Sequence, residues 1–231
     1  MLTASEWAES RLGYRFRDGA LLEAALTHRS VGRCNYERLE FVGDAVLNFA
    51  VAALLYRELP DADEGELSRY RAALVSGSTL AEVAAGLRLG EQLRLGSGEL
   101  KTGGHRRSSI LADALEALFG AVCLDGGIGV AAGVVESLLA GRLGALPQAH
   151  ELKDPKTRLQ EQLQAQGLPL PEYEVETVSG EPHDQWFVAR CDVAALELQT
   201  RGEGSSRRRA EQEAAQRVLA QITGDEVTGH D

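Results

Sequence analysis

Apolar residues recur at every third or fourth position through most of the first part of the chain, a spacing typical of amphipathic helices. The longest run extends from about Tyr36 to Arg57 and ends before Pro60, because the residue before a proline disfavours helix. The same spacing predicts helices near Ser78–Leu87, Arg107–Cys123 and Val130–Leu143. Five glycines between Gly90 and Gly104 indicate a loop. No strand-like alternation occurs before residue 150, so this part is expected to be all-α.

The pattern changes after residue 150. A helix is expected from about Lys156 to Gln166, where Gly167 ends it. Three runs then alternate between apolar and polar residues, as half-buried strands do: Tyr173–Val178, Phe187–Val193 and Leu196–Thr200. Ser206 is placed to cap a closing helix that reaches Ile222. The order helix, three strands, helix predicts a small α+β domain.

These two patterns divide the 231 residues into a helical domain at 1–146, a linker at 147–153, an α-β-β-β-α domain at 154–223 and a tail at 224–231. The first residues lack a basic segment followed by an apolar core, so no signal peptide is expected. The longest nearly uncharged apolar stretch, Ala45–Tyr56, is shorter than a membrane span. Widely separated Cys34, Cys123 and Cys191 favour a reducing compartment without a zinc site. We therefore expect a cytoplasmic protein with no membrane partner.

Charge limits how the chain could bind nucleic acid. The net charge of −11 argues against binding through bulk electrostatics. Residues 151–231 carry nine Lys and Arg against sixteen Asp and Glu, a net of −7, whereas residues 1–150 have a net of −4. Any contact between the second domain and nucleic acid must therefore use local clusters of basic residues.

Two pairs of carboxylates stand in apolar runs far apart in the sequence. Glu40 and Asp44 are four residues apart and Asp113 and Glu116 are three apart, so on a helix each pair lies on one face. Buried carboxylates are costly unless they are paired or bind a metal. Four such groups without a His partner indicate a hard cation such as Mg²⁺, which in proteins often serves to cut phosphodiesters. The alternative is that both pairs line solvated helix faces, and spacing alone cannot show that the two helices face each other.

Several segments resemble bacterial ribonuclease III, an endonuclease specific for double-stranded RNA. These segments are Asn35–Leu47, Leu100–Gly104 with Ile110–Glu116, Asp154–Glu161 and Gly204–Arg208. The first resembles a long and specific signature of the family, and the last two resemble the ends of its double-stranded-RNA-binding domain. The resemblance covers residues 1–223 in order. It implies an all-α endonuclease domain followed by a small α+β double-stranded-RNA-binding domain.

The resemblance also implies roles for the four carboxylates. Glu40, Asp113 and Glu116 match residues that ligate Mg²⁺, for which Mn²⁺ can substitute. Asp44 and Glu116 match catalytic residues. Physically, such an ion would lower the pKa of a bound water and stabilise charge on the attacked phosphate.

Three further positions in the first domain match the family. Glu37 and Glu64 match supporting acids, although Glu64 also fits an ordinary acidic helix start. Phe41 matches a dimer contact in which each subunit's apolar side chain enters a pocket of the other. Taken alone, a residue such as Phe41 more often belongs to a core. The family implies a homodimer, and twofold dimers are the commonest assemblies of soluble proteins.

In the second domain, the candidate RNA contacts are Gln160, Glu161, His183, Ser206, Arg207 and Arg208. A helix face, a loop and a second helix start can together span two minor grooves of a duplex. Backbone amides at a helix start favour phosphate, and arginines add charge. The alternatives are an ordinary solvated helix start for the arginines and a simple turn for His183. Many such domains have a further Lys where this chain has Glu211, which weakens the expected grip on phosphate.

The sequence therefore predicts a Mg²⁺-dependent, homodimeric endoribonuclease that hydrolyses double-stranded RNA. The resemblance implies 5′-phosphate and 3′-hydroxyl products with short 3′ overhangs, and the processing of ribosomal RNA precursors and other structured RNAs. One alternative is a catalytically silent double-stranded-RNA-binding protein, which would usually lack one of the four carboxylates. Another is a helical metal protein that acts on small molecules or oxygen. That class needs Glu-x-x-His motifs, and the chain has none.

Overall fold

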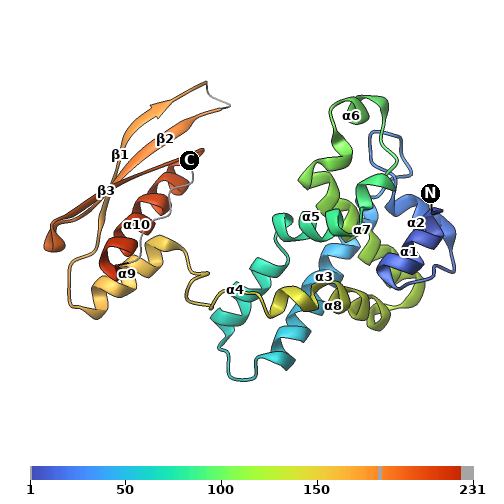
Figure 1. Ribbon diagram of the computed structural model, residues 1–231, viewed down its shortest axis with the longest axis horizontal. Helices are drawn as coiled ribbons and strands as arrows, with labels where there is room; N and C mark the ends of the chain where they lie inside the picture. Colours follow the sequence, from blue (N-terminus) through green and yellow to red (C-terminus); the bar gives the residue numbers. More distant parts are fainter. Residues whose placement is uncertain (1, 182–183, 225–231) are drawn as a thin grey trace. The chain divides into compact units, whose positions relative to one another are not determined.

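The computed structural model describes residues 2–181 and 184–224 (Figure 1). The chain divides into two compact units, with the boundary between Ala149 and His150. This boundary falls within residues 147–153, the segment predicted as a linker. Each unit has its own hydrophobic core, so each positions its functional residues by its own packing.

The described part of the first unit is helical. Its helices are α1 (Ala4–Leu12), α2 (Gly19–Ala25), α3 (Glu37–Glu58), α4 (Glu64–Leu74), α5 (Gly77–Gly86), α6 (Ser97–Lys101), α7 (Ser108–Gly126) and α8 (Ile128–Leu143). Two 3₁₀ turns, Leu89–Glu91 and Gly104–Arg106, join them. The prediction of a plain loop over 90–104 was wrong, because this segment contains α6. None of the five residues of α6 is buried, so it leaves no apolar periodicity in the sequence.

Helix α7 forms the centre of the first core, and α3, α5 and α8 pack around it. Its contact with α3 is unusually close. A Cβ atom on Gly43 of α3 would lie 1.7 Å from the carbonyl oxygen of Glu116, and one on Gly120 of α7 would lie 2.1 Å from that of Leu39. Only glycine fits at these two positions, and the two backbones therefore touch.

Helix α3 is long and apolar enough, by length and composition alone, to cross a membrane. Its Leu47, Ala50 and Val51 side chains are fully buried in the core of the first unit. Helices α7 and α8 pack against it. This packing is typical of the central helix of a folded domain, and it accounts for the apolar composition of α3.

The second unit is an α-β-β-β-α fold. Its elements are α9 (Pro155–Ala165), β1 (Glu172–Ser179), β2 (Trp186–Val193), β3 (Leu198–Gly204) and α10 (Arg207–Thr223). The strands form an antiparallel sheet in the order β1-β2-β3. Leu159 and Leu163 of α9 pack with Val218 of α10 and Cys191 of β2. With the helical first unit, this confirms the predicted fold class.

The third strand begins two residues later than predicted. It begins at Leu198, because Ala194–Leu196 forms a 3₁₀ turn and Glu197 has a positive φ of 54°. It then continues through Gly202 to Gly204. A Cβ atom on Gly202 would lie 2.2 Å from the backbone nitrogen of Ala214, so this glycine lets α10 pack directly on the sheet. That contact fixes the start of α10, where the basic residues lie.

The close contact between α3 and α7 makes a testable prediction. Gly43→Ala should destabilise the first unit, because the added Cβ atom cannot fit unless α3 moves away from α7. Overpacking of this kind costs ~1–3 kcal/mol. Urea unfolding followed by circular dichroism measures the loss. Gly133→Ala in α8 is the matched control, since its Cβ atom meets nothing within 4 Å. Equal stability of the Gly43 variant and the control would contradict the account.

Candidate active site and RNA interface

Helix α3 begins with an acidic turn. Oδ1 of Asn35 accepts a hydrogen bond of 2.9 Å from the backbone N–H of Glu37. The backbone N–H of Glu40 donates to the carbonyl of Tyr36, also at 2.9 Å. The positive end of the helix dipole favours carboxylates in this first turn, where Glu37 and Glu40 lie. The helix start thus fixes where the two acids project.

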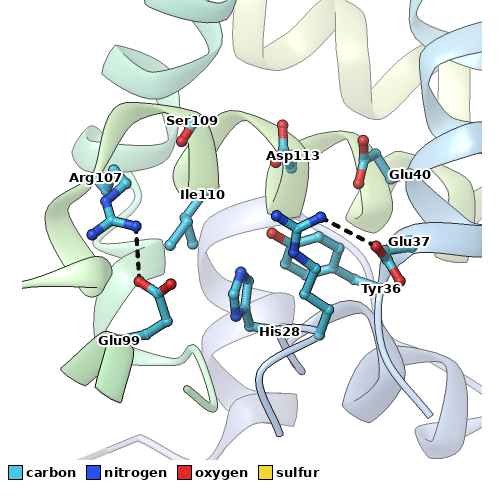
Figure 2. A pocket seen from close by; sticks show the side chains of 10 residues that line it. His28, Tyr36, Glu37, Glu40, Glu99, Arg107, Ser109, Ile110 and Asp113 are labelled. Carbon is cyan, nitrogen blue, oxygen red and sulfur yellow. Dashed lines mark hydrogen bonds and ion pairs between the residues drawn. The ribbon is translucent and has the colours of Figure 1, made fainter. Parts of the chain in front are cut away.

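A cleft of about 250 Å³ lies beside the starts of α3 and α7 (Figure 2). It is lined by His28, Arg29, Tyr36, Glu37, Glu40, Glu99, Arg107, Ser109, Ile110 and Asp113. In Figure 2, the carboxyl groups of Glu40 and Asp113 lie toward one end and the ion pair between Arg107 and Glu99 lies at the other. One carboxylate of each predicted pair therefore faces the same cleft.

Asp44 and Glu116, the second members of the pairs, belong to the same electrostatic cluster. Burial, followed by the charges of Asp44, Glu40 and Asp113, raises the pKa of Glu116 to about 7. Charges act at this strength only over short distances inside a protein. Glu40 and Asp113 line the same cleft, and the backbone of Glu116 touches α3 at Gly43, so the two pairs lie on the adjoining sides of α3 and α7.

Two of the carboxylates that line the cleft, those of Glu40 and Asp113, also resist ionisation. Burial is the main cause that raises the pKa of Glu40, and the charge of Asp113 adds to it. Burial likewise raises the pKa of Asp113, while the charges of Arg29 and His28 oppose the shift. Raised pKa values on neighbouring carboxyl groups mark a place where added positive charge would be favourable.

A metal ion needs donor atoms of a suitable kind that lie around one centre. Four carboxyl groups supply only oxygen donors, which suits a hard divalent cation. Among residues 2–181 and 184–224, no three acidic, His or Cys side chains stand close enough to coordinate one ion as they are placed. The chemistry and charge of the cluster fit a divalent cation, and ligation would need rotation of the side chains toward a common centre.

The two predicted supporting acids lie in different places. Glu37 lines the cleft, and its carboxyl oxygen lies 3.6 Å from a guanidinium nitrogen of Arg29. Glu64 instead opens α4, where it accepts a hydrogen bond of 2.8 Å from Oγ of Ser68. It lines a different hollow together with Arg71. Within one copy of the chain, the structure does not bring Glu64 to the carboxylate cluster.

The cleft contains further residues, of which His28 and Arg107 match polar positions near the family's cleavage cleft, whereas Tyr36, Arg29 and Glu99 were given no role from the sequence. The buried ring of Tyr36 packs edge-on against His28, with centroids 5.5 Å apart. Glu99 of α6 accepts a hydrogen bond of 2.9 Å from Arg107, and Arg29 pairs with an acid of α3. These residues come from loops or from the short α6. Helical periodicity therefore gives no signal that would place them beside α3 and α7.

Phe41 projects from α3 into solvent, with 82% of its surface exposed. The alternative that it belongs to the core of its own subunit is wrong. Phe49 and Tyr56 on the same helix are also exposed, at 59% and 77%. Spacings of eight and seven residues place all three on one side of α3. We call Phe41, Phe49 and Tyr56 the α3 apolar stripe.

In the second unit, basic residues gather at the start of α10. Ser206 is the N-cap of this helix, and its Oγ accepts a hydrogen bond of 3.3 Å from the backbone N–H of Arg209. The side chains of Arg207 and Arg208 are 68% and 77% exposed. Cations at a helix N-terminus are opposed by the helix dipole, so a role in stabilising α10 does not explain them.

The other candidate RNA contacts are less closely grouped. Gln160 and Glu161 are exposed on α9. Glu161 accepts a hydrogen bond of 2.7 Å from Nζ of Lys153, so its carboxylate is already paired. His183 lies outside the described residues. The described surface that presents exposed cations together with a capped helix start is therefore that of α10.

Two family models match the chain, one for each unit. Residues 18–143 match the model described as ribonuclease-III-like, and residues 155–222 match the double-stranded RNA binding motif. Together they define a class of RNA-cutting enzyme in which a helical nuclease domain carries a separate domain for double-stranded RNA.

Individual relatives show which family within this class the chain belongs to. Ribonuclease 3 of Alkalilimnicola ehrlichii is 55% identical over 222 residues, which cover 96% of this chain and 97% of that protein. Ribonuclease 3 of Thiobacillus denitrificans is 56% identical over 214 residues, 93% of this chain and 95% of that protein. A crystal structure of the nuclease domain of ribonuclease III from Campylobacter jejuni is 39% identical, with a TM-score of 0.59, and covers 63% of this chain and 100% of that one. The chain belongs to the ribonuclease III family, which confirms the resemblance, and it is an endoribonuclease.

The raised pKa of Glu116 predicts how metal-free protein responds to pH. The folded pKa of about 7 exceeds the ordinary value of 4.5, so ionising Glu116 costs more in the folded state. Wild-type stability should therefore fall as pH rises from about 4.5 through about 7. Glu116→Gln carries no charge at any pH and should escape this loss. In EDTA at pH 8, we expect its Tm to exceed that of the wild type by ~2–5 °C.

Thermal melts at pH 5 and pH 8 measure this difference. It should shrink at pH 5, where wild-type Glu116 is largely protonated. Added Mg²⁺ should raise the Tm of the wild type more than that of Glu116→Gln, because a ligand that binds the folded state stabilises it. A Tm difference that is the same at both pH values would contradict the placement of Glu116 in a repulsive cluster.

Proposed function

We propose that this endoribonuclease depends on Mg²⁺, acts as a homodimer and cuts both strands of double-stranded RNA. Its products would carry 5′-phosphates, 3′-hydroxyls and short 3′ overhangs, and its substrates would include precursors of ribosomal RNA and other structured RNAs. The observation that carries the proposal is that Glu40 of α3 and Asp113 of α7 line one cleft, where α3 touches α7 at Glu116, in a chain that also has a double-stranded-RNA-binding domain. Three free cysteines support a cytoplasmic location.

We assign metal ligation to Glu40, Asp113 and Glu116, with Mn²⁺ as a substitute for Mg²⁺. A bound divalent ion supplies a water of lowered pKa and stabilises charge on the attacked phosphate and the leaving oxygen. The protein contributes the arrangement of the acids. Their mutual repulsion favours a cation between α3 and α7, and burial of Glu116 strengthens that attraction.

Asp44 has a different environment from the three proposed ligands. It is exposed, and its Oδ1 accepts a hydrogen bond of 3.0 Å from Nδ2 of Asn48 one turn later. This contact restrains the carboxylate of Asp44, for which we propose the role of holding a water molecule by accepting a hydrogen bond from it. Glu37 would act indirectly, by holding Arg29 at the edge of the cleft.

The α3 apolar stripe supports the homodimer. Phe41, Phe49 and Tyr56 each expose more than half of their surface, and contiguous exposed apolar surface commonly marks a protein interface. A related crystal structure, that of the nuclease domain of Campylobacter jejuni ribonuclease III, is described as showing structural flexibility in a region involved in dimer formation. It is 42% identical to this chain, with a TM-score of 0.57, and covers 59% of this chain and 96% of that one. A twofold dimer would place two carboxylate clusters in one assembly, one for each strand of a duplex.

Binding of the duplex would use the start of α10. Arg207 and Arg208 are exposed there, and the Ser206 cap leaves backbone N–H groups of the first turn to face an anion. Contacts to phosphate position a duplex without reading its sequence. Gln160 on α9 would add a polar contact from the neighbouring helix of the same unit.

Glu116→Gln tests the catalytic proposal. It removes one negative ligand and keeps the shape of the side chain, so the fold and RNA binding should persist. Cleavage of a long double-stranded RNA in saturating Mg²⁺ should fall by about 100-fold or more. Ca²⁺ should support binding better than cleavage, because it accepts looser geometry. Glu136→Gln, which removes an acid paired with Arg57 elsewhere in the first unit, should cleave normally. Wild-type rates for Glu116→Gln would refute its assignment as a ligand.

Phe41→Ala tests the homodimer. Loss of a buried aromatic side chain from an interface pocket should weaken association by ~3–5 kcal/mol. Because Phe41 is exposed in the single subunit, the Tm of dissociated protein should change little. Sedimentation velocity at low micromolar concentration distinguishes dimer from monomer. Leu124→Ala removes another exposed apolar side chain, 58% exposed at the far end of α7, and should leave the dimer intact. Unchanged association of the Phe41 variant would exclude it from the interface.

The double variant Arg207→Ala with Arg208→Ala tests the RNA surface. Loss of phosphate contacts should weaken two unrelated duplexes by a similar factor, because phosphates carry no sequence information. The slope of log affinity against log salt should become shallower by roughly one to two. Cleavage should persist at low salt through the nuclease unit. Fluorescence anisotropy across a salt series measures both quantities, and an unaltered slope would place the RNA contacts elsewhere.

A further inference from the structure

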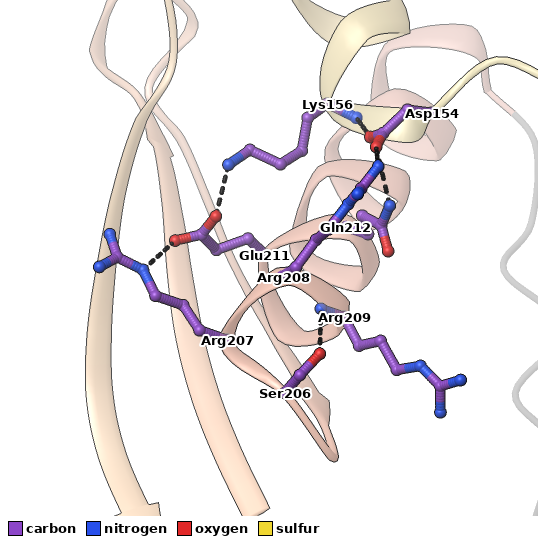
Figure 3. Close-up of polar contacts among 8 residues, drawn as sticks. All are labelled: Asp154, Lys156, Ser206, Arg207, Arg208, Arg209, Glu211 and Gln212. Carbon is purple, nitrogen blue, oxygen red and sulfur yellow. Dashed lines mark hydrogen bonds and ion pairs between the residues drawn. The ribbon is translucent and has the colours of Figure 1, made fainter.

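The cations at the start of α10 are already engaged within the protein. Oε1 of Glu211 accepts a hydrogen bond of 2.7 Å from Nε of Arg207, and the other oxygen pairs with the ammonium group of Lys156 (Figure 3). The side chain of Glu211 is only 8% exposed, whereas that of Arg207 is 68% exposed. A nearly buried carboxylate thus holds two cations that border the solvent.

A second acid holds the next arginine. Oδ2 of Asp154 accepts hydrogen bonds from Arg208 at 3.0 Å and from Gln212 at 2.8 Å. Asp154 is also the N-cap of α9, since its Oδ1 accepts the backbone N–H of Lys156 at 3.0 Å. In Figure 3, both acids lie between the starts of α9 and α10, and Arg209 points away from them.

These pairs reduce the charge that the surface offers to RNA. Lys156, Arg207 and Arg208 carry three positive charges, and Glu211 and Asp154 cancel two of them. The carboxylates also occupy N–H donors that would otherwise face a phosphate oxygen. Carboxylate and phosphate accept the same charge-assisted hydrogen bonds from a guanidinium group, so they compete for each arginine.

Glu211 is ionised under ordinary conditions and can therefore compete. Burial raises its pKa, but hydrogen bonds and charges from Lys156 and Arg207 outweigh burial and hold the pKa below its usual range. The two arginines are long and exposed, so they can turn outward, while the nearly buried carboxylate stays in place. A duplex that binds must draw these arginines away from a fixed negative charge.

We propose that Glu211 and Asp154 compete with RNA phosphate for Arg207, Arg208 and Lys156, and so limit the affinity of the second unit for double-stranded RNA. This inference rests on the proposed RNA surface at the start of α10. In this arrangement Glu211 and Asp154 weaken the binding of RNA. Capture of a duplex would then depend on simultaneous engagement of the nuclease unit.

Glu211→Gln in the full chain is the direct test. The amide keeps the shape and one acceptor but removes the charge. Affinity for two unrelated duplexes, measured by anisotropy in EDTA so that no cleavage occurs, should increase by roughly 3- to 10-fold, and the salt slope should steepen by about one. Asp154→Asn should act in the same direction, because the one oxygen of Asn can keep the N-cap while both the charge and the acceptor that hold Arg208 are lost. If Glu211→Gln unfolds below the assay temperature, Asp154→Asn provides the test instead.

Glu176→Gln is the matched control. Glu176 of β1 also pairs with two cations, Arg201 and Arg190, and its loss changes the net charge of the unit equally. The RNA affinity of Glu176→Gln should stay within about twofold of wild type, because Glu176 lies on the exposed face of the sheet, away from α10. Equal tightening by Glu176→Gln and Glu211→Gln would overturn the proposal in favour of net charge alone. Unchanged or weaker binding by folded Glu211→Gln and Asp154→Asn would also overturn it.

A further comparison separates this inference from the RNA surface on which it rests. In a protein that already carries Arg207→Ala and Arg208→Ala, most of the gain from Glu211→Gln should disappear. If those two substitutions leave wild-type affinity unchanged, the surface itself is misplaced and both proposals fail. If they weaken binding while Glu211→Gln gives no gain, only the competition is refuted.

Discussion

The contact between α3 and α7 through Gly43 and Gly120 is the constraint on which the active site depends. Each glycine meets a backbone carbonyl of the other helix, closer than any side chain would allow. Because the carbonyl that faces Gly43 is that of Glu116, the point of closest approach lies beside the acids that we propose to be catalytic. Glu40 and Asp44 flank one glycine, and a carboxylate pair on α7 precedes the other. A wider crossing would give four separate surface acids with no shared cation site.

The same contact explains why the site is unstable by itself. Close approach of α3 and α7 buries Glu116 among like charges, which lifts its pKa to about 7. The proposed cation site would therefore oppose stability until an ion binds, as is common where charged groups are gathered for catalysis. Helices α4 and α8 cover other parts of α3, and the side that carries Phe41, Phe49 and Tyr56 is exposed. One helix thus carries proposed metal ligands on one side and the α3 apolar stripe on another.

Much of this arrangement could be predicted from the sequence, because it follows from local periodicity. The long helices, the three strands, the Ser206 cap and the spacing of both carboxylate pairs are local features. The facing of the two pairs could not be predicted from spacing, because it depends on Gly43 and Gly120, which look like ordinary helix glycines. Arg29 and Glu99 enter the cleft from irregular segments, and α6 buries nothing that would reveal it. In the sequence, Glu211 stands where many such domains have Lys. Only the fold shows which cations Glu211 pairs with.

The central claim is that the four carboxylates form one site for a divalent cation. Crystals of the full chain soaked in Mn²⁺, with diffraction data collected at the manganese absorption edge, would locate the ion directly by its anomalous signal. We expect a peak between α3 and α7, within coordination distance of carboxylate oxygens of Glu40, Asp113 and Glu116. A peak elsewhere on the chain, or no peak at this cluster at millimolar Mn²⁺, would contradict it.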